Sequence, residues 1–329
     1  MNTVFINPQT KLLHGGWRAA IFLLLSPFAL DLISALLRTD EQESGGTLIV
    51  GVSTIIYYVI LIAWVLTSSW LFLKYFEQLK LSSLGFAFYR RVGTELLTGC
   101  AISALMIVVV VALQIIGGGT RLLLNPMFWK SADGVRSIDF TGVAIIAKGA
   151  VLTLVFISLA AAFEELLFRG YAFQTLLRDG ISPIVPIILL SLIFGLAHWS
   201  NPSRTIFSTT NTMLAGVWLS VAYLKTRSLW FPTALHLAWN WTMGFIFGLP
   251  VSGLKLAQHP IFLSTSEAPL WLTGGSYGCE GGAPTTLILV VATIIIWKVK
   301  FLRVAPEMEA VLQKNSPDHQ ASIKLGLVE

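Results

Sequence analysis

Long apolar runs separated by short polar segments occupy most of the chain between residues 17 and 303. A helix that crosses the hydrocarbon core of a bilayer needs about 20 predominantly apolar residues. The pattern predicts eight such helices, at 17–37, 48–73, 92–116, 141–163, 184–200, 206–223, 229–248 and 285–303. The predicted fold class is therefore all-α, a polytopic membrane helical bundle of about eight transmembrane helices.

The composition and the positions of the basic residues extend this prediction. Of the 329 residues, 55% are hydrophobic and 12% are charged, whereas about 25% are charged in an average soluble domain. With the N-terminus inside, 15 of the 22 Lys and Arg residues fall in inner segments and 6 in outer loops. This bias predicts that both termini are cytoplasmic. We expect a multi-pass protein of a bacterial-type plasma membrane, whose net charge of +5 faces anionic lipid headgroups, and no nucleic-acid partner.

The distribution of polar residues divides the chain into four parts. Residues 1–140 form an N-terminal accessory region of three spans and an outer loop, in which Asp31 is the clearly internal acid. Residues 141–248 form a four-span catalytic core. Residues 249–304 form an outer loop and the last span, and 305–329 a cytoplasmic tail. Long loops are often functional, although a plain connector is an equal alternative for this one.

The stretch FEELLFRG, residues 163–170, puts three ionisable groups at the end of an apolar run. Such groups are expensive inside a membrane and mark candidate functional sites. Glu165 and Arg169 have the i, i+4 spacing of an ion pair along one helix face. The side chain of Glu164 points about 100° away from that of Glu165, so the two carboxylates are not expected to face the same partner. We predict that Glu165 and Arg169 brace each other and that Glu164 is a free base; a structural salt bridge with a spare glutamate is the alternative.

Two of the five histidines lie in apolar spans. SLIFGLAHW places Phe194 and His198 four residues apart near the end of the fifth span, where a helix-capping histidine is the alternative reading. FPTALHLAWNW places His236 and Asn240 four residues apart on one face of the seventh span. These two hydrogen-bonding side chains are suited to stabilise a developing oxyanion, with an interhelical polar clamp as the alternative. One active site explains the carboxylate, the histidine and the His/Asn pair together.

Three motifs in this order carry a family resemblance. EELLFR at 164–169 matches EExxxR, FGLAH at 194–198 matches FxxxH, and HLAWN at 236–240 matches HxxxN. Over about 141–248 the chain resembles the CPBP (Abi) family of intramembrane endopeptidases, which includes the type II CAAX prenyl proteases.

The resemblance implies a peptidase with catalytic residues Glu164, His198, His236 and Asn240. The first two would activate a water molecule, and the last two would stabilise the tetrahedral oxyanion. By the same correspondence the supporting residues are Glu165, Arg169 and Phe194. The implied substrate is a membrane-associated peptide or protein in the lipid bilayer.

A metal-dependent mechanism is the alternative to glutamate-activated water. Two Glu and two His residues are possible zinc ligands, and a zinc site would use Glu164, His198 and His236. However, the chain has no HExxH pair on one helix, and the oxyanion role already occupies His236. We therefore expect no cofactor, with zinc as the alternative.

Two other functions compete with the peptidase. One is a non-catalytic membrane scaffold or bacteriocin-immunity-type factor. The other is a proton-coupled transporter, which is less favoured because the sequence lacks the paired broken helices typical of transporters.

The predicted topology separates two residues that must meet. A fourth span that ends at 163 puts Glu164 near its inner end, whereas His198 lies up to about 22 Å along a helix from Pro183. A shared site requires the fourth helix to extend past Arg169 into GYAFQTLLRDG, with the fifth span starting deep in the membrane.

Overall fold

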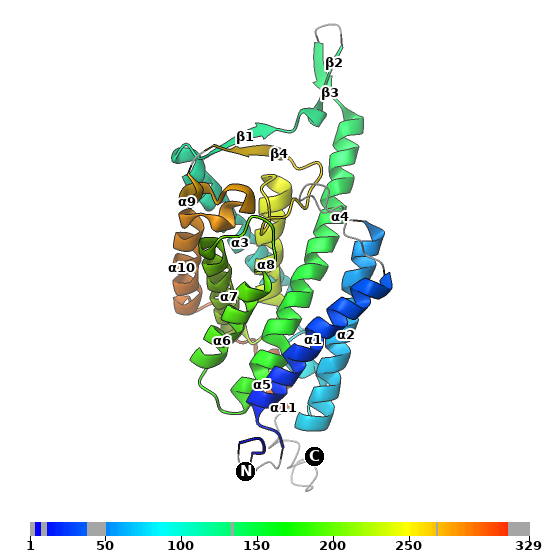
Figure 1. The fold of residues 1–329 in the computed structure, drawn as a ribbon, viewed down its shortest axis with the longest axis vertical. Helices are drawn as coiled ribbons and strands as arrows, with labels where there is room; N and C mark the ends of the chain where they lie inside the picture. The colour runs from blue at the N-terminus through cyan, green and yellow to red at the C-terminus, as the bar shows by residue number, and fades with distance from the viewer. Residues whose placement is uncertain (1–3, 8–11, 38–50, 133–134, 268, 315–329) are drawn as a thin grey trace.

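The structure, a computed structural model, describes residues 4–7, 12–37, 51–132, 135–267 and 269–314 and is built mainly from helices (Figure 1). The α-helices are α1 (Gly15–Leu37), α2 (Val52–Phe72), α3 (Val92–Ile116), α4 (Phe140–Glu165), α5 (Ala172–Arg178), α6 (Ile184–Ala197), α7 (Ile206–Thr226), α8 (Trp230–Trp241), α9 (Leu270–Thr273), α10 (Ala283–Lys298) and α11 (Pro306–Lys314). The start of α1 and the helix α11 lie at the same end of the bundle, at the bottom of the view. The side chain of Asp31, residues 48–50 and the tail from 315 lie outside the described part of the chain.

A helix lies at each of the eight expected positions, but eight membrane crossings are not confirmed. Among the described residues, three helices are long and apolar enough to cross a membrane: Val52–Glu77, Val92–Ile116 and Phe140–Arg178. Helix α7 has 21 residues, but it is not one of these three helices. Its sequence contains polar residues such as Ser208 and Asn211, whose side chains are buried. The structure supports an integral membrane protein, while the crossing number and the orientation stay predictions.

The all-α prediction missed two small antiparallel sheets. Strand β1 (Thr120–Leu124) pairs with β4 (Phe262–Ser266), and β2 (Trp129–Ala132) pairs with β3 (Val135–Ile138). Figure 1 shows all four strands at the end of the bundle opposite the start of α1. Strands of four or five residues are too short to produce a clear two-residue periodicity in the sequence. The β1–β4 pairing joins two loops that are far apart along the chain.

The fourth helix extends as the shared site requires. Beyond α4 the chain continues through the π-helical segment Leu166–Tyr171 into α5, with a kink at Gly170 (φ −74°, ψ −121°). A turn then leads into α6, which packs on α5. The chain runs 14 residues from Glu164 to Arg178 at the end of α5, and 14 residues from Ile184 at the start of α6 back to His198. The returning helix therefore brings His198 back to the level of Glu164.

Close helix contacts hold the bundle together across the predicted boundary at residue 140. A Cβ atom added to Gly99 on α3 would lie 2.7 Å from Cβ of Ala234 on α8, so this position tolerates no larger side chain without movement. Gly216 on α7 is equally restricted by Ser191 on α6, whose Cα would lie 2.9 Å from the added Cβ. The division into four regions stays a prediction; the Gly99–Ala234 contact packs α3 against α8 across the boundary, whereas the Gly216–Ser191 contact lies within residues 141–248.

An ion-pair network joins α1, the end of α2 and the end of α5. Arg18 lies 3.0 Å from Glu77 and 3.5 Å from Asp179, and Arg178 lies 2.5 Å from Glu77. The side chains of Arg18 and Glu77 are 8% and 6% exposed. Because the pair is buried, each charge depends on its partner to offset lost hydration.

Replacing Glu77 should therefore destabilise the protein strongly. We expect Glu77→Gln to lower the free energy of unfolding by about 3–5 kcal/mol, because it leaves buried Arg18 without its closest carboxylate. Denaturant titration of the detergent-purified protein measures this change.

The matched control is Glu267→Gln in the pair of Arg121 and Glu267, whose side chains are 79% and 61% exposed. Exposed pairs contribute at most about 1 kcal/mol. Equal losses in the two variants would show that burial of the network adds nothing to stability.

Candidate active site

A cavity of about 300 Å³ opens between α4, α6, α7, α8 and the segments around residues 251–256 and 280–289. The sequence-predicted residues in its wall are Glu164, Phe194, His198, His236 and Asn240. Most of the remaining wall is apolar, with aromatic side chains such as Trp218 and Trp239. The structure thus brings the candidates of three helices, α4, α6 and α8, to one largely apolar cavity.

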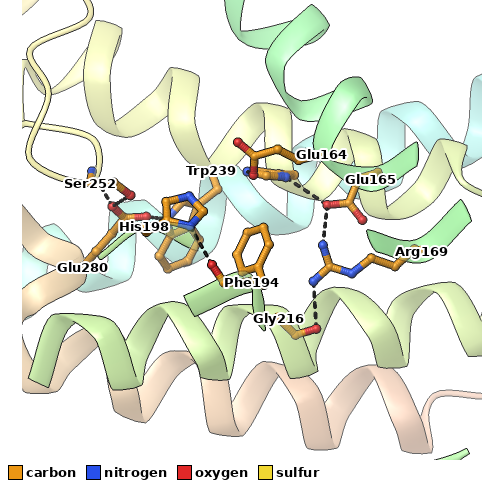
Figure 2. Close-up of polar contacts among 10 residues, drawn as sticks. Glu164, Glu165, Arg169, Phe194, His198, Gly216, Trp239, Ser252 and Glu280 are labelled. Atoms are coloured by element: carbon orange, nitrogen blue, oxygen red, sulfur yellow. Dashed lines mark hydrogen bonds and ion pairs between the residues drawn. The ribbon is translucent and has the colours of Figure 1, made fainter. Parts of the chain in front are cut away.

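Behind the cavity wall, Glu165 links a guanidinium to an imidazole. Its Oε1 lies 3.0 Å from Nη1 of Arg169 and 2.9 Å from Nδ1 of His236. Nη2 of Arg169 donates to the carbonyl oxygen of Gly216 on α7 at 2.9 Å. Figure 2 shows Glu165 pointing toward Arg169, and Arg169 toward Gly216. The expected ion pair is present, and it also connects α4 to α7 and α8.

Glu164 and Glu165 do face a common partner, contrary to the expectation from their angular separation. Oε2 of Glu164 lies 3.7 Å from Nε2 of His236, whereas Glu165 contacts Nδ1 of the same ring. An imidazole has two nitrogens on different edges, so it reaches carboxylates that point in different directions. The inference from side-chain angles failed because it assumed that a partner has one polar atom, whereas the His236 ring has two.

The two adjacent glutamates have different surroundings. The side chain of Glu164 is 23% exposed and lines the cavity. Glu165 is 0% exposed and paired with Arg169. Glu164 is therefore the carboxylate of the two that a molecule in the cavity can reach.

His198 both caps a helix and faces the cavity. Its Nδ1 lies 2.7 Å from the carbonyl oxygen of Phe194 in the last turn of α6. A carbonyl oxygen only accepts, so Nδ1 carries the proton, and Nε2 of the neutral ring is an acceptor. The helix-capping reading and the catalytic reading are thus compatible in this residue.

The ring of Phe194 packs among the charged and polar groups. Its centroid lies 4.8 Å from the His198 ring, 6.1 Å from the His236 ring and 4.8 Å from the Arg169 guanidinium carbon. The Arg169 contact has the geometry of a cation–π interaction. Phe194 therefore contacts both imidazoles and restricts the position of Arg169.

Asn240 lies one helical turn beyond His236 on α8 and lines the cavity. In the described part of the chain it forms no hydrogen bond with another residue, so its side-chain amide is free to bind a ligand. Its neighbour Trp239 is engaged, because Nε1 of that indole donates to Glu280 at 3.0 Å.

The residues of the zinc alternative are not grouped as a metal site in the described ranges, where no three His, Cys, Asp or Glu side chains lie so that they could hold a metal ion. The Nδ1 atoms of His198 and His236 are engaged by Phe194 and Glu165. A metal-binding histidine commonly donates its other ring N–H to a carbonyl or a carboxylate, so Nε2 of each ring is the nitrogen available to a ligand.

Sequence reasoning missed Glu280, which reaches the cavity from the predicted outer loop. Its carboxylate accepts from Trp239 and from the backbone and hydroxyl of Ser252, at 2.6–3.0 Å. Figure 2 shows Glu280 beside Ser252, away from Glu165 and Arg169. The available signal was a single acid in the glycine-rich stretch TGGSYGCEGGAP, which carries no helical spacing to connect it with the motifs.

Residues 146–242 match a family model described as type II CAAX prenyl endopeptidase Rce1-like. This segment is similar to the Rce1-like family. The match confirms the family resemblance expected from the three motifs, all of which fall inside it. No curated protein and no solved structure matches the chain. The Rce1-like segment contains Glu164, His198 and His236, while Glu280 lies outside it.

The two glutamates should differ sharply in their effect on stability. We expect Glu165→Gln to lower the free energy of unfolding by about 3–5 kcal/mol, because Arg169 would lose its buried counter-ion. Glu164→Gln should lower it by less than about 1 kcal/mol, since this carboxylate has no hydrogen bond to lose. Denaturant titrations of the two purified variants measure both values, and equal losses would contradict the division of roles.

Proposed function

We propose that the protein is an intramembrane peptidase that hydrolyses a peptide bond of a membrane-associated peptide or protein with a water molecule activated by Glu164 and His198. The observation that carries the proposal is the position of His236. Its ring lies between Glu164 and Glu165, at a cavity that His198 and Asn240 also line. A site for acyl transfer needs a base, an acceptor for water and donors for an oxyanion in one place, and the side chains of this cavity support the assignment of all three roles here.

In the proposed first step, water binds between Glu164 and the unprotonated Nε2 of His198. The water oxygen attacks the peptide carbonyl carbon while Glu164 takes the proton. The carbonyl π electrons move onto oxygen, forming a tetrahedral oxyanion. General base catalysis of this kind contributes typically 10²–10⁴-fold to a rate.

His236 and Asn240 are the proposed donors to that oxyanion. Because Nδ1 of His236 donates to Glu165, donation from Nε2 requires the doubly protonated ring. The two carboxylates beside the ring supply the negative charge that an imidazolium needs. Collapse of the intermediate then breaks the C–N bond, and the proton held by Glu164 passes to the leaving nitrogen.

Glu165 and Arg169 act as positioning residues in this scheme. The salt bridge fixes the carboxylate that orients His236, and the contact with Gly216 fixes Arg169 against α7. The imidazole is oriented before the substrate arrives. Its donor therefore needs no reorganisation when the oxyanion forms, which makes electrostatic stabilisation efficient.

The apolar character of the cavity supports a membrane-associated substrate. Phe156, Trp218 and Leu289 line it together with the catalytic candidates. A hydrophobic peptide segment can therefore enter without leaving apolar surface exposed to water.

The proposal predicts a large loss of cleavage activity without loss of the fold. In an assay with purified protein and a panel of labelled membrane peptides, we expect Glu164→Gln and His198→Asn to reduce kcat by about 10²–10⁴-fold. Asn240→Ala should reduce kcat by about 10²–10³-fold, the usual effect of removing one oxyanion donor.

Glu267→Gln, at an exposed pair distant in sequence from the motifs, is the control and should cleave like the wild type. Unchanged cleavage in Glu164→Gln would refute the assigned base. If no peptide is cleaved by any form, while a membrane partner binds wild type and Glu164→Gln alike, the scaffold alternative is the better description.

Prolonged chelation distinguishes the proposed mechanism from zinc catalysis. We expect the cleavage rate to remain unchanged after dialysis against a strong chelator, because protein groups alone activate the water. A loss of activity that zinc restores, together with stoichiometric zinc in the purified protein, would favour the metal-dependent alternative.

A further inference from the structure

Glu280 contributes a second carboxylate to the cavity, and the proposed reaction does not use it. The residue lies in the short helical turn Cys279–Gly281, ahead of α10. Its Oε2 accepts from the backbone N–H of Ser252 at 2.6 Å and from the Ser252 hydroxyl at 2.8 Å, and its Oε1 accepts from the Trp239 indole at 3.0 Å. Three donors on two segments hold the carboxylate in one orientation at the cavity wall.

The charge of this carboxylate has no counter-ion. All three donors are neutral groups, and no ion pair in the described part of the chain includes Glu280. An ionised carboxylate offers about four acceptor positions, so at least one position is open to a further donor. None of the described residues that line the cavity is a Lys or Arg. Arg169 lies behind the wall and is paired with Glu165, and the imidazolium proposed at His236 is paired with Glu164 and Glu165.

We propose that Glu280 is a binding subsite for a cationic group on the substrate, such as a lysine ammonium or an arginine guanidinium. A charged carboxylate at an apolar cavity is energetically unfavourable unless a cation or several donors compensate it. The three neutral donors compensate it partly and fix its position, while a substrate cation would supply the missing opposite charge. A charge-assisted hydrogen bond of this kind is roughly twice as strong as a neutral one.

The subsite lies close to the proposed oxyanion donors. Trp239, which holds Glu280, is adjacent to Asn240 and one helical turn from His236. The same cavity contains all of these groups. The bound cation therefore belongs to a residue within a few positions of the scissile bond, since each extended residue spans about 3.3 Å.

This subsite also defines the substrate class. Two carboxylates, Glu164 and Glu280, lie in the cavity wall, and none of the described lining residues is a Lys or Arg. Resting on the proposed function, the inference names the substrate class as an apolar, membrane-associated peptide with a basic residue near the cleaved bond.

Binding measurements test the subsite without any need for cleavage. The protein used is Glu164→Gln, which removes the other cavity carboxylate, and the probes are fluorescent apolar peptides that differ in a single Lys or norleucine. The Lys is moved stepwise along the peptide, and the dissociation constant is measured by fluorescence anisotropy in detergent. For at least one position we expect the Lys peptide to bind about 10-fold more tightly, the effect of one charge-assisted hydrogen bond. In Glu164→Gln/Glu280→Gln this preference should disappear.

Ser252→Ala in the same background is the matched variant, because it removes one donor to Glu280 and keeps the charge. It should retain most of the Lys preference. If Ser252→Ala abolishes the preference as fully as Glu280→Gln, the effect comes from loop anchoring and the proposal is wrong. The absence of any Lys preference while Glu280 is present also refutes it, a comparison that needs no folded Glu280 variant.

The outcome is separable from that of the proposed function. If the protein prefers Lys peptides through Glu280 but never cleaves a peptide, the subsite is supported and the proposed peptidase activity is refuted. If the wild type cleaves Lys and norleucine peptides at equal rates for every position, the peptidase activity is supported and the subsite is refuted.

Discussion

The buried guanidinium of Arg169 is the constraint on which the rest of the site depends. Its side chain is 1% exposed, so the protein must compensate the positive charge internally. Glu165 supplies the opposite charge, and the Gly216 carbonyl on α7 supplies a further acceptor. Because Glu165 also accepts from His236 on α8, compensating one charge fixes the relative positions of three helices. The catalytic candidates lie on the cavity side of this arrangement.

The sequence predicted the contacts within single helices better than those between helices. The i, i+4 spacing of Glu165 and Arg169 follows from the 3.6-residue period alone, and the pair is present. The contact of both glutamates with His236 depends on how α8 packs against α4, which close approaches such as Gly99 against Ala234 determine. No single-sequence pattern encodes that packing, and the angular argument about Glu164 and Glu165 failed for this reason.

The sequence also failed to predict the structure of segments that lack a long periodic pattern. The continuation of α4 into α5 was deducible only because Glu164 and His198 had to meet, while the strands of the outer loops and Glu280 had no comparable requirement. The pairing of β1 with β4 is a non-local contact between segments of five residues each. Such pairing depends on two loops meeting in space, so the sequence of either loop alone does not predict it. The fold class was therefore right for the helices and incomplete for the loops.

The two cavity carboxylates differ in a way that matches different tasks. A general base must be reachable by the water molecule that it deprotonates, and the side chain of Glu164 is 23% exposed, lines the cavity and forms no hydrogen bond with a described residue. Three donors hold the Glu280 carboxylate in one orientation, which suits it to bind a cation at a fixed position. Proton transfer is thus proposed at one carboxylate and charge recognition at the other. A peptide that presents a cation to the second would place its adjacent backbone near the first, so that charge recognition and water activation would select the same bond.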